Sequence, residues 1–329
     1  MRNKILSILM KSKDKYVSGE DISIKLGISR TAVWKHIKAL RESGYEIESA
    51  TKKGYRLVQI PDILDAAVIS YNLNSKIIGR KIYVYDRIDS TNIKAKELAD
   101  EASEEGTIVL AEEQTAGKGR LSRKWLSPSG GGIWLSIILR PPLLPIHAPK
   151  ITSMAAAAVL KAVNHVTGLE CGVKWPNDII INDKKVCGIL TEMQSDIDVI
   201  KYVVVGIGIN VNMTQEDLAP EIRKSATSLR IEKGSKIHRI DIIQSICSFM
   251  EEIYMDYINT RNFAPILNIC REHSVTLGKK VRVIGKESEY EGRAIDLCDD
   301  GALIVEKENG QRVKVIAGDV SVRGIAGYV

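Results

Sequence analysis

The feature that most constrains the fold is the uneven distribution of charge along the 329 residues of this chain. Residues 1–60 hold 13 of the 47 Lys and Arg, but only 6 of the 41 Asp and Glu. The net charge of +6 therefore arises entirely in this first segment. A small basic module on a nearly neutral body is typical of a polyanion-binding appendage, although a solvated basic surface would give the same balance. The sequence thus predicts a separate N-terminal domain, and the length also favours two or three domains.

The hydrophobic pattern of this basic segment predicts two short helices joined by a tight turn. Ser18 to Leu26 reads as the first helix, and Gly27 supplies a residue that readily adopts a positive φ. Ser29 is placed to cap a second helix, Arg30 to Leu40, whose start is basic and polar. This arrangement is the helix-turn-helix pattern, in which the second helix reads the major groove.

A predicted hairpin after these helices extends the pattern to a winged helix-turn-helix. Tyr45 to Ser49 and Tyr55 to Val58 read as strands around a Lys-Lys-Gly tip, which suits contact with the phosphate backbone. The alternative is a helical packing module that binds no DNA. Pro61-Asp62 marks the end of this domain, predicted at 1–60. The expected DNA-binding residues are Ser29, Arg30, Thr31, Trp34, Lys35, Lys38, Lys52 and Lys53.

The rest of the chain alternates helical and strand patterns, which predicts an α+β fold with one mixed sheet covered by helices. Residues 62–273 form the predicted central domain, with an Ala-rich helix from Ile151 to Val166. Short strands with Gly-containing turns fill residues 275–329 and predict a small β-barrel. Aromatic residues make up only 5% of the chain, so the cores are expected to be aliphatic.

Several common classes of protein are excluded by missing motifs. The cysteines are odd in number and widely spaced, which argues against a disulfide framework or zinc site and suits a reducing compartment. No P-loop, complete dinucleotide fingerprint or H-E-x-x-H motif occurs, and the five His are scattered. The first apolar run, Ile5 to Met10, is too short for a signal peptide or membrane span. We therefore expect a cytoplasmic protein with no membrane partner and no resident metal.

The densest functional signal is a glycine-rich basic loop from Glu113 to Trp125 that directly follows a predicted strand. Gly117 and Gly119 allow backbone N–H groups to approach a ligand closely. Four cationic residues within seven positions can hold phosphate oxygens. An exposed basic turn would have the same composition. The four cations are Lys118, Arg120, Arg123 and Lys124.

Three further segments have polar residues at expected ends of strands and helices. Asp89 to Asn92 lies between a strand and a helix, where hydroxyls grip a polar ligand or simply cap the helix. Val173 to Asp178 is a compact polar turn, or a connector fixed by Pro176. Lys185 opens a strand in which Gly188 removes a side chain, and a lone lysine beside a hairpin is more often just solvated.

Taken together, these segments resemble the biotin protein ligases in order and approximate spacing. The motifs that carry the resemblance are Ser90-Thr91-Asn92, Gln114 to Trp125, Lys174 to Asp178, Lys185 to Leu190 and Gly206-Ile207-Gly208-Ile209-Asn210. The N-terminal winged helix-turn-helix resembles the bifunctional form, which is also the biotin operon repressor. The resemblance covers essentially the whole chain and implies a central ligase domain of the biotin/lipoate type and an SH3-like C-terminal domain.

The resemblance implies an ATP-dependent ligase with biotin, ATP and Mg²⁺ as its ligands. Biotin and ATP give biotinyl-5′-AMP, and a lysine of biotin carboxyl carrier protein then accepts the biotin. Arg120 is expected at the phosphates and Lys185 near the carboxylate and α-phosphate; Asp178 accepts a proton or helps hold magnesium. The full set of expected ligand-binding residues is Ser90, Thr91, Asn92, Gln114, Gly117, Lys118, Gly119, Arg120, Trp125, Asn177, Lys185, Gly188 and Asn210. Strand residues near Gly132 and Gly188 are expected to line an apolar slot.

The resemblance also implies how the protein is regulated. By resemblance, the adenylate favours a homodimer, through the strand edge after Gly188, that binds two-fold operator DNA. Lys118 replaces the family's usual Arg, which removes the planar fork while keeping the charge. A ligand-sensing repressor without catalysis and a lipoate or octanoate ligase are the two alternatives.

Overall fold

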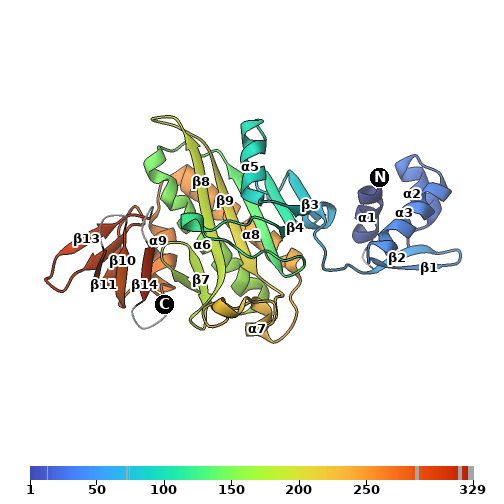
Figure 1. The fold of residues 1–329 in the computed structure, drawn as a ribbon. Coiled ribbons are helices and arrows are strands. Elements are labelled where there is room, and N and C mark those ends of the chain that lie inside the picture. The colour runs from blue at the N-terminus through green and yellow to red at the C-terminus, as the bar shows by residue number, and fades with distance from the viewer. Residues whose placement is uncertain (13, 72, 74, 286–288, 318–320, 325–329) are drawn as a thin grey trace. The chain divides into compact units, whose positions relative to one another are not determined.

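The computed structural model describes residues 1–324 except residues 13, 72, 74, 286–288 and 318–320. Residues 325–329, the end of the expected C-terminal domain, lie outside the described residues. The chain divides into two compact units, residues 1–72 and 73–329 (Figure 1). The first unit continues past the boundary expected at residue 61, because Asp65 accepts hydrogen bonds from Arg2 and Tyr45 inside it.

The first unit is a winged helix-turn-helix, as expected. Ser18 accepts hydrogen bonds from Glu20 and Asp21, and Gly27 ends the same helix with φ +63°. Ser29 caps the next helix through Ala32 N–H. A preceding helix, which the sequence analysis did not identify, contributes Ile5 and Leu6 to the core. The elements are α1 (Arg2–Lys11), α2 (Gly19–Leu26), α3 (Arg30–Glu42), β1 (Glu46–Ala50), β2 (Gly54–Gln59) and α4 (Ala66–Tyr71).

The second unit is built on a seven-stranded mixed sheet in the order β3-β4-β5-β9-β8-β7-β6 (Figure 1). Strands β3 and β4 are parallel, and the other neighbours are antiparallel. β6 overlaps the segment expected to be a polar turn, since its residues pair with β7. The strands are β3 (Ile82–Ile88), β4 (Ile108–Gln114), β5 (Gly132–Leu139), β6 (Gly172–Lys174), β7 (Asp178–Ile181), β8 (Lys184–Ser195) and β9 (Ile200–Asn210).

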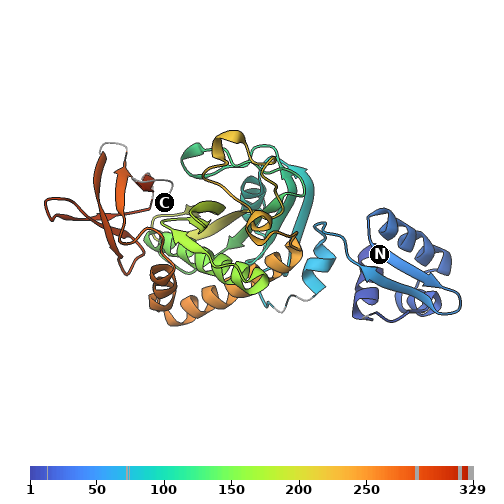
Figure 2. The same cartoon turned by 90° about the horizontal axis from the view of Figure 1, so that it is seen from below.

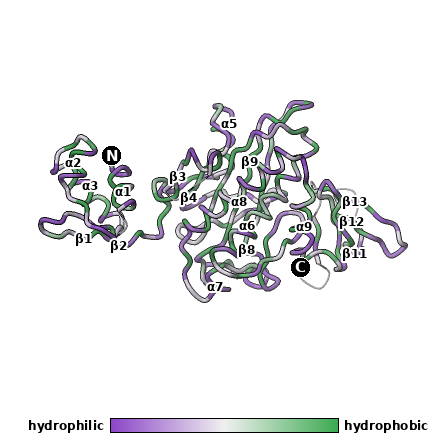
Figure 3. The backbone as a smooth tube through the Cα atoms, turned by 180° about the vertical axis from the view of Figure 1, so that it is seen from behind, coloured by the Kyte–Doolittle hydropathy of each residue, from purple (hydrophilic) through white to green (hydrophobic). Residues whose placement is uncertain are grey.

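Helices cover the sheet and bury its aliphatic side chains. α5 packs on β4, β5 and β9, and α6 and α8 pack on one another and on the sheet (Figure 2). The Ala-rich α6 ends at Gly168, which has φ +72°. Figure 3 shows hydrophobic residues in the interior of this unit and hydrophilic residues at hairpin tips. The helices are α5 (Thr91–Asp100), α6 (Ala148–Thr167), α7 (Leu229–Lys233), α8 (Arg239–Thr260) and α9 (Ala264–Glu272), with 3-10 turns at Arg120–Ser122, Pro145–His147 and Pro220–Ile222.

The C-terminal segment forms a second sheet of five antiparallel strands, in the order β13-β12-β11-β10-β14. Trp175 joins the two sheets, because its Nε1 donates to Gly301 O at 2.9 Å and its N donates to Thr276 Oγ1 at 3.0 Å. No helix in the described part of the chain has the length and hydropathy needed to cross a bilayer. The strands are β10 (Lys280–Ile284), β11 (Glu289–Leu297), β12 (Leu303–Glu306), β13 (Arg312–Val315) and β14 (Ser321–Gly324).

Candidate active site

A cavity of about 720 Å³ lies in the second unit, and its walls come from both sheets. Of the residues expected to bind ligand or catalyse, Gly117 does not lie along it. Its backbone O accepts from Trp125 N, and a Cβ at this position would lie 2.5 Å from Trp125 O, so this glycine serves packing within the loop. The expected residues along the cavity are Ser90, Thr91, Asn92, Gln114, Lys118, Gly119, Arg120, Trp125, Asn177, Asp178, Lys185, Gly188 and Asn210.

Part of the cavity lining consists of neutral hydrogen-bonding groups in fixed orientations. Gln114 Oε1 accepts from Thr91 N at 2.8 Å, and Gln114 Nε2 donates to Ser127 Oγ at 2.8 Å. Ser90 is 2% exposed and stands at the cap position of α5, but its hydroxyl makes no capping hydrogen bond. Plain helix capping therefore does not account for Ser90. Oriented amide and hydroxyl groups of this kind suit a small polar ring.

Asn92 lies along the cavity and is also bonded to neighbouring strands. Its Oδ1 accepts from Ser136 Oγ at 2.6 Å, and its Nδ2 donates to Glu192 Oε2 at 2.8 Å. Lys96 and Asn92 together lower the pKa of Glu192 although burial opposes this shift. These two bonds connect α5 to β5 and β8 beside the cavity.

Trp125 and the two glycines beneath it shape the middle of the cavity. Added Cβ atoms would lie 2.6 Å from Trp125 Nε1 at Gly208 and 3.1 Å from the indole at Gly188. Only glycine leaves room for the ring there. Trp125 Nε1 is buried against Gly208 and has no hydrogen-bond partner in the described structure. Ile189 and Leu190 line the cavity beside Gly188, as expected, whereas near Gly132 it is lined by Trp134 and Leu135.

The cavity lining is also strongly cationic. Asp178 supplies the only carboxylate along the described lining. Leu121 lies inside the basic loop with φ +55°, a left-handed conformation that costs energy for a residue with a side chain. Such a wall suits a ligand with several negative charges. The cationic residues along the lining are Lys118, Arg120, Arg123, Lys124, Lys174, Lys185 and Arg323.

Three contacts arrange the residues expected to be catalytic. Lys185 Nζ lies 2.6 Å from Asp178 Oδ1, and the same ammonium sits 5.2 Å from the centre of the Trp125 ring. Arg120 Nη1 donates to Asn177 Oδ1 at 3.2 Å. Asn177 Nδ2 in turn donates to Ile189 O at 2.7 Å, so the Asn177 amide orients Arg120. The structure therefore brings Arg120, Lys185 and Asp178 to one wall of the cavity.

Two cationic residues of the cavity lining were not assigned a role from sequence. Lys174, in the motif before Asp178, is 7% exposed, and burial lowers its pKa to about 8, with the charges of Lys185, Arg323 and Arg123 adding to the shift. Arg323 comes from β14 of the C-terminal sheet. No local pattern marks Arg323 as a site residue, because it reaches the cavity only through the packing of the two sheets. Asn210, expected near the nucleotide, donates through Nδ2 to Thr227 O at 3.0 Å.

The donor set for a metal is small. Within the described residues, no three His, Cys, Asp or Glu side chains come together as a metal site. Mg²⁺ is usually bound through one or two carboxylates plus substrate phosphates. One carboxylate beside cationic side chains that could hold phosphates fits that ion. Asp178, with Asn177 next to it, is the residue that meets this requirement.

The first unit presents the expected DNA-facing residues on its surface. Trp34 is 51% exposed, although it lies on the same helix as the buried Val33 and Ile37. Lys52, at the tip of the β1–β2 hairpin, has φ +64°. The exposed cations of α3 form a basic helix face, and the two lysines of the hairpin form a basic wing. The exposed residues are Ser29, Arg30, Thr31, Trp34, Lys35, Lys38, Lys52 and Lys53.

Family models match three parts of the chain. Residues 84–210 match the biotin/lipoate A/B protein ligase family, residues 1–56 match an HTH domain, and residues 276–323 match the biotin protein ligase C-terminal domain. Among solved structures, the biotin protein ligase from Aquifex aeolicus in complex with biotin and ATP aligns with a TM-score of 0.65 and 28% identity. This alignment covers 74% of this chain and 99% of that one.

Curated relatives extend the match to nearly the whole chain. The bifunctional ligase/repressor BirA of Bacillus subtilis is 40% identical over 320 residues, which is 97% of this chain and 98% of the relative. The biotin–[acetyl-CoA-carboxylase] ligase of Mycobacterium tuberculosis is 33% identical over 261 residues, covering 76% of this chain and 93% of the relative. With an HTH domain, a ligase domain and the family's C-terminal domain in this order, the chain is a ligase that belongs to the biotin protein ligase family in its bifunctional ligase/repressor form.

Proposed function

We propose that this protein joins biotin to ATP as biotinyl-5′-AMP and then transfers biotin to a lysine of biotin carboxyl carrier protein. The observation that carries the proposal is one cavity whose described lining combines neutral hydrogen-bonding groups with seven cationic side chains. The relatives support the ligands, since the Aquifex aeolicus ligase was solved with biotin and ATP. A Leishmania major ligase with biotinyl-5-AMP aligns at a TM-score of 0.50 and 26% identity, over 72% of this chain and 99% of that one.

In the first half-reaction, a biotin carboxylate oxygen attacks the α-phosphorus of ATP, and the bond to pyrophosphate breaks. Carboxylate and triphosphate repel one another, so the site must place positive charge where they meet. Lys185, oriented by Asp178, lies at this wall, and Arg120, oriented by Asn177, serves the phosphates. Ser90, Thr91 and Gln114 hold the ureido ring of biotin.

Mg²⁺ neutralises phosphate charge when it is bound with ATP, and Asp178 and Asn177 are the residues that would hold it. In the second half-reaction, the carrier amine attacks the acyl carbon, the bond between that carbon and the phosphate oxygen breaks, and AMP leaves. We assign to Asp178 the proton released by the attacking amine, after pyrophosphate has departed. Trp125 shields the anhydride from water during the interval between the two steps.

The direct experiment is pyrophosphate release from ATP and Mg²⁺, with and without biotin. Release that depends on biotin supports the ligase proposal, and Arg120→Ala is expected to reduce it by about 10²-fold or more. Lipoate and octanoate in place of biotin test the related acyl ligases, because a fatty chain cannot pair with Thr91 and Gln114. Tight biotin binding without any release would instead indicate a sensor that lacks the chemistry.

We further propose that α3 and the β1–β2 wing bind operator DNA of biotin-related genes as part of a homodimer. The HTH match and the exposed cationic helix face support this role. The edge of β8 beyond Gly188 pairs with β9 alone in the described ladder, and Ile197 at the adjoining hairpin is 92% exposed. Sedimentation with and without biotin plus ATP tests dimer formation there. The five thiols are unpaired, which suits a cytoplasmic location.

Replacing both Lys52 and Lys53 by Ala is expected to weaken binding to the upstream DNA of its own gene, whatever the base sequence. Each lost phosphate contact reduces the slope of the logarithm of the binding constant against the logarithm of salt concentration by about one. Binding titrations at several salt concentrations measure this slope. Lys4→Ala, at an exposed lysine of α1, is the matched control. An equal effect of Lys4→Ala, or an unchanged slope in the wing variant, contradicts the assignment of the wing.

A further inference from the structure

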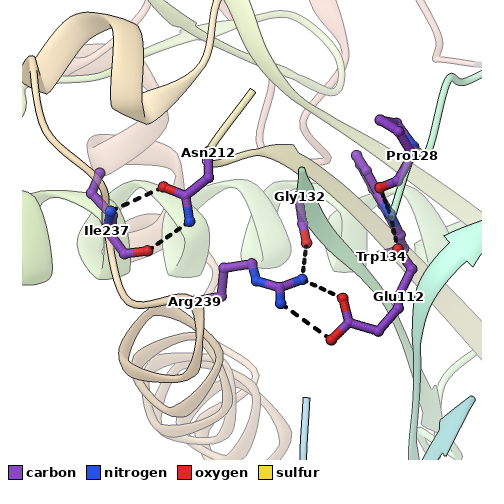
Figure 4. Close-up of polar contacts among 7 residues, drawn as sticks. All are labelled: Glu112, Pro128, Gly132, Trp134, Asn212, Ile237 and Arg239. Atoms are coloured by element: carbon purple, nitrogen blue, oxygen red, sulfur yellow. Dashed lines mark hydrogen bonds and ion pairs between the residues drawn. The ribbon is translucent and has the colours of Figure 1, made fainter. Parts of the chain in front are cut away.

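A buried ion pair lies at the base of the glycine-rich loop. The β4–β5 ladder ends at the Ala111–Trp134 pair, and residues 115–131 connect the two strands, with a bridge from Ser127 back to Gln114. Arg239, the first residue of α8, is 1% exposed. Its Nη1 donates to Glu112 Oε2 at 2.7 Å and to Gly132 O at 3.2 Å, and its Nη2 donates to Glu112 Oε1 at 3.1 Å (Figure 4). One guanidinium therefore joins both strands where their ladder stops.

Two neighbouring contacts reinforce this connection. Trp134 Nε1 donates to Glu112 O at 3.2 Å and to Pro128 O at 3.3 Å, so the indole also links β4 to the end of the loop. Asn212 and Ile237 exchange two hydrogen bonds, of 2.8 and 3.0 Å, which fix the chain just before α8 (Figure 4). The chain that precedes Arg239 is therefore fixed by hydrogen bonds, while the Arg239 side chain bonds to both strands. We call Glu112, Trp134 and Arg239 the loop clasp.

The Glu112–Arg239 ion pair does not itself line the cavity. Neither Glu112 nor Arg239 belongs to the described lining, whereas Gln114, two residues after Glu112, does. Trp134 also lines the cavity, and its Nε1 donates to the backbone O of Glu112. A shift at Glu112 is therefore transmitted to Gln114 and to the start of the basic loop.

Stability alone is a poor reason for such a pair. A buried ion pair is often no more stabilising than apolar residues of similar volume, because desolvation offsets the attraction. A cation at the first position of α8 is also unfavourably placed for the helix dipole. What the guanidinium provides is a rigid fork that fixes direction at a carboxylate and a carbonyl together.

We propose that the Glu112–Arg239 pair positions the glycine-rich loop and sets how long the acyl-adenylate stays enclosed before transfer. This inference rests on the proposed ligase function. When the base of the loop is fixed, its cations stay over the phosphate and water stays out. When the pair is removed, the loop still carries its charges but closes less often. Both residues are positioning residues, and the retention of the adenylate is their readout.

The test compares Arg239→Met with wild type after the adenylate has formed from biotin, ATP and Mg²⁺. Free ligand is removed, and the release of biotinyl-5′-AMP is followed by rapid filtration. The expected result is an adenylate half-life shorter by roughly tenfold or more, because a loop that closes less often leaves the cavity open to release. Arg239→Lys, which keeps the charge without the fork, is expected to lie between the two.

Arg140→Met is the matched control, because Arg140 also ties backbone carbonyls together beside β5, at its other end. It donates to Ala99 O at 2.7 Å and to Lys201 O at 3.1 Å. We expect this variant to melt at a lower temperature and to retain adenylate as wild type does. Equal loss of retention in Arg140→Met, or a half-life within twofold of wild type in Arg239→Met, overturns the proposal.

A double variant, Glu112→Met with Arg239→Met, covers the case in which the single variant does not fold. It removes both charges and refills the space, so stability is expected to return while retention stays low. Wild-type retention in the folded double variant would also overturn the proposal. The ligase function is judged separately, by biotin-dependent pyrophosphate release in wild type. Failure of that reaction in wild type rejects the function, whereas failure only of retention in the variants concerns the clasp.

Discussion

Lys185→Met is expected to lower the turnover of biotin adenylation by about 10²- to 10³-fold, while biotin binding changes little. The ammonium lies 2.6 Å from Asp178 Oδ1, whereas Thr91 and Gln114, the residues expected to bind biotin, bond to one another. Its charge matters most when negative charge builds up between the carboxylate and the α-phosphorus. Pyrophosphate release under saturating ATP measures turnover, and calorimetry measures biotin binding.

Lys184→Met provides the control for Lys185, because the adjacent lysine carries the same charge but is not part of the described lining. We expect it to behave as wild type. Removal of Lys185 also leaves the carboxylate of Asp178, whose side chain is 14% exposed, without this cation. The double variant with Asp178→Asn relieves that cost in stability. Turnover within fivefold of wild type in the folded single variant would reject Lys185 as a catalytic residue.

Lys174→Met is expected to make the ligand-free protein more stable at pH 7, by as much as about 3 kcal/mol, and to weaken ATP binding. Burial lowers the pKa of Lys174 from 10.5 to about 8, and a tenfold change in an acid dissociation constant corresponds to about 1.4 kcal/mol. Below pH 8 the folded protein carries this buried charge at its full cost. Between pH 8 and 10.5 the unfolded chain binds more protons, so the stability of wild type rises with pH.

The difference in stability between Lys174→Met and wild type is therefore largest below pH 8 and shrinks as the pH approaches 10.5. Urea unfolding at several pH values measures it. A rise in the KM for ATP with a smaller change in the KM for biotin is the functional counterpart, because Lys174 lies among the cations of the cavity. A variant that is less stable than wild type at pH 7 would contradict this account of Lys174.

Local chemistry made much of the fold predictable from sequence. Ser18 and Ser29 cap the helices that they precede, and Gly27 adopts the positive φ that a tight turn needs. The Ala-rich helix ends at Gly168, as predicted. Helix α1 was not identified because its apolar run is short and its first residue makes no side-chain cap. β6 was not identified because three residues beside a proline turn carry too short a pattern.

The sequence by itself determined the modules of this protein and the chemical types of its site residues, since glycines, hydroxyls and cations are grouped in short stretches. Only the tertiary structure decided which of them line the cavity and what they contact there. Asn92 lies in the expected motif but is engaged by Ser136 and Glu192, whereas Arg323 enters from a different sheet. The Glu112–Arg239 pair joins residues 127 positions apart. Contacts across such separations depend on how sheets and helices pack, and no local pattern of residues specifies them.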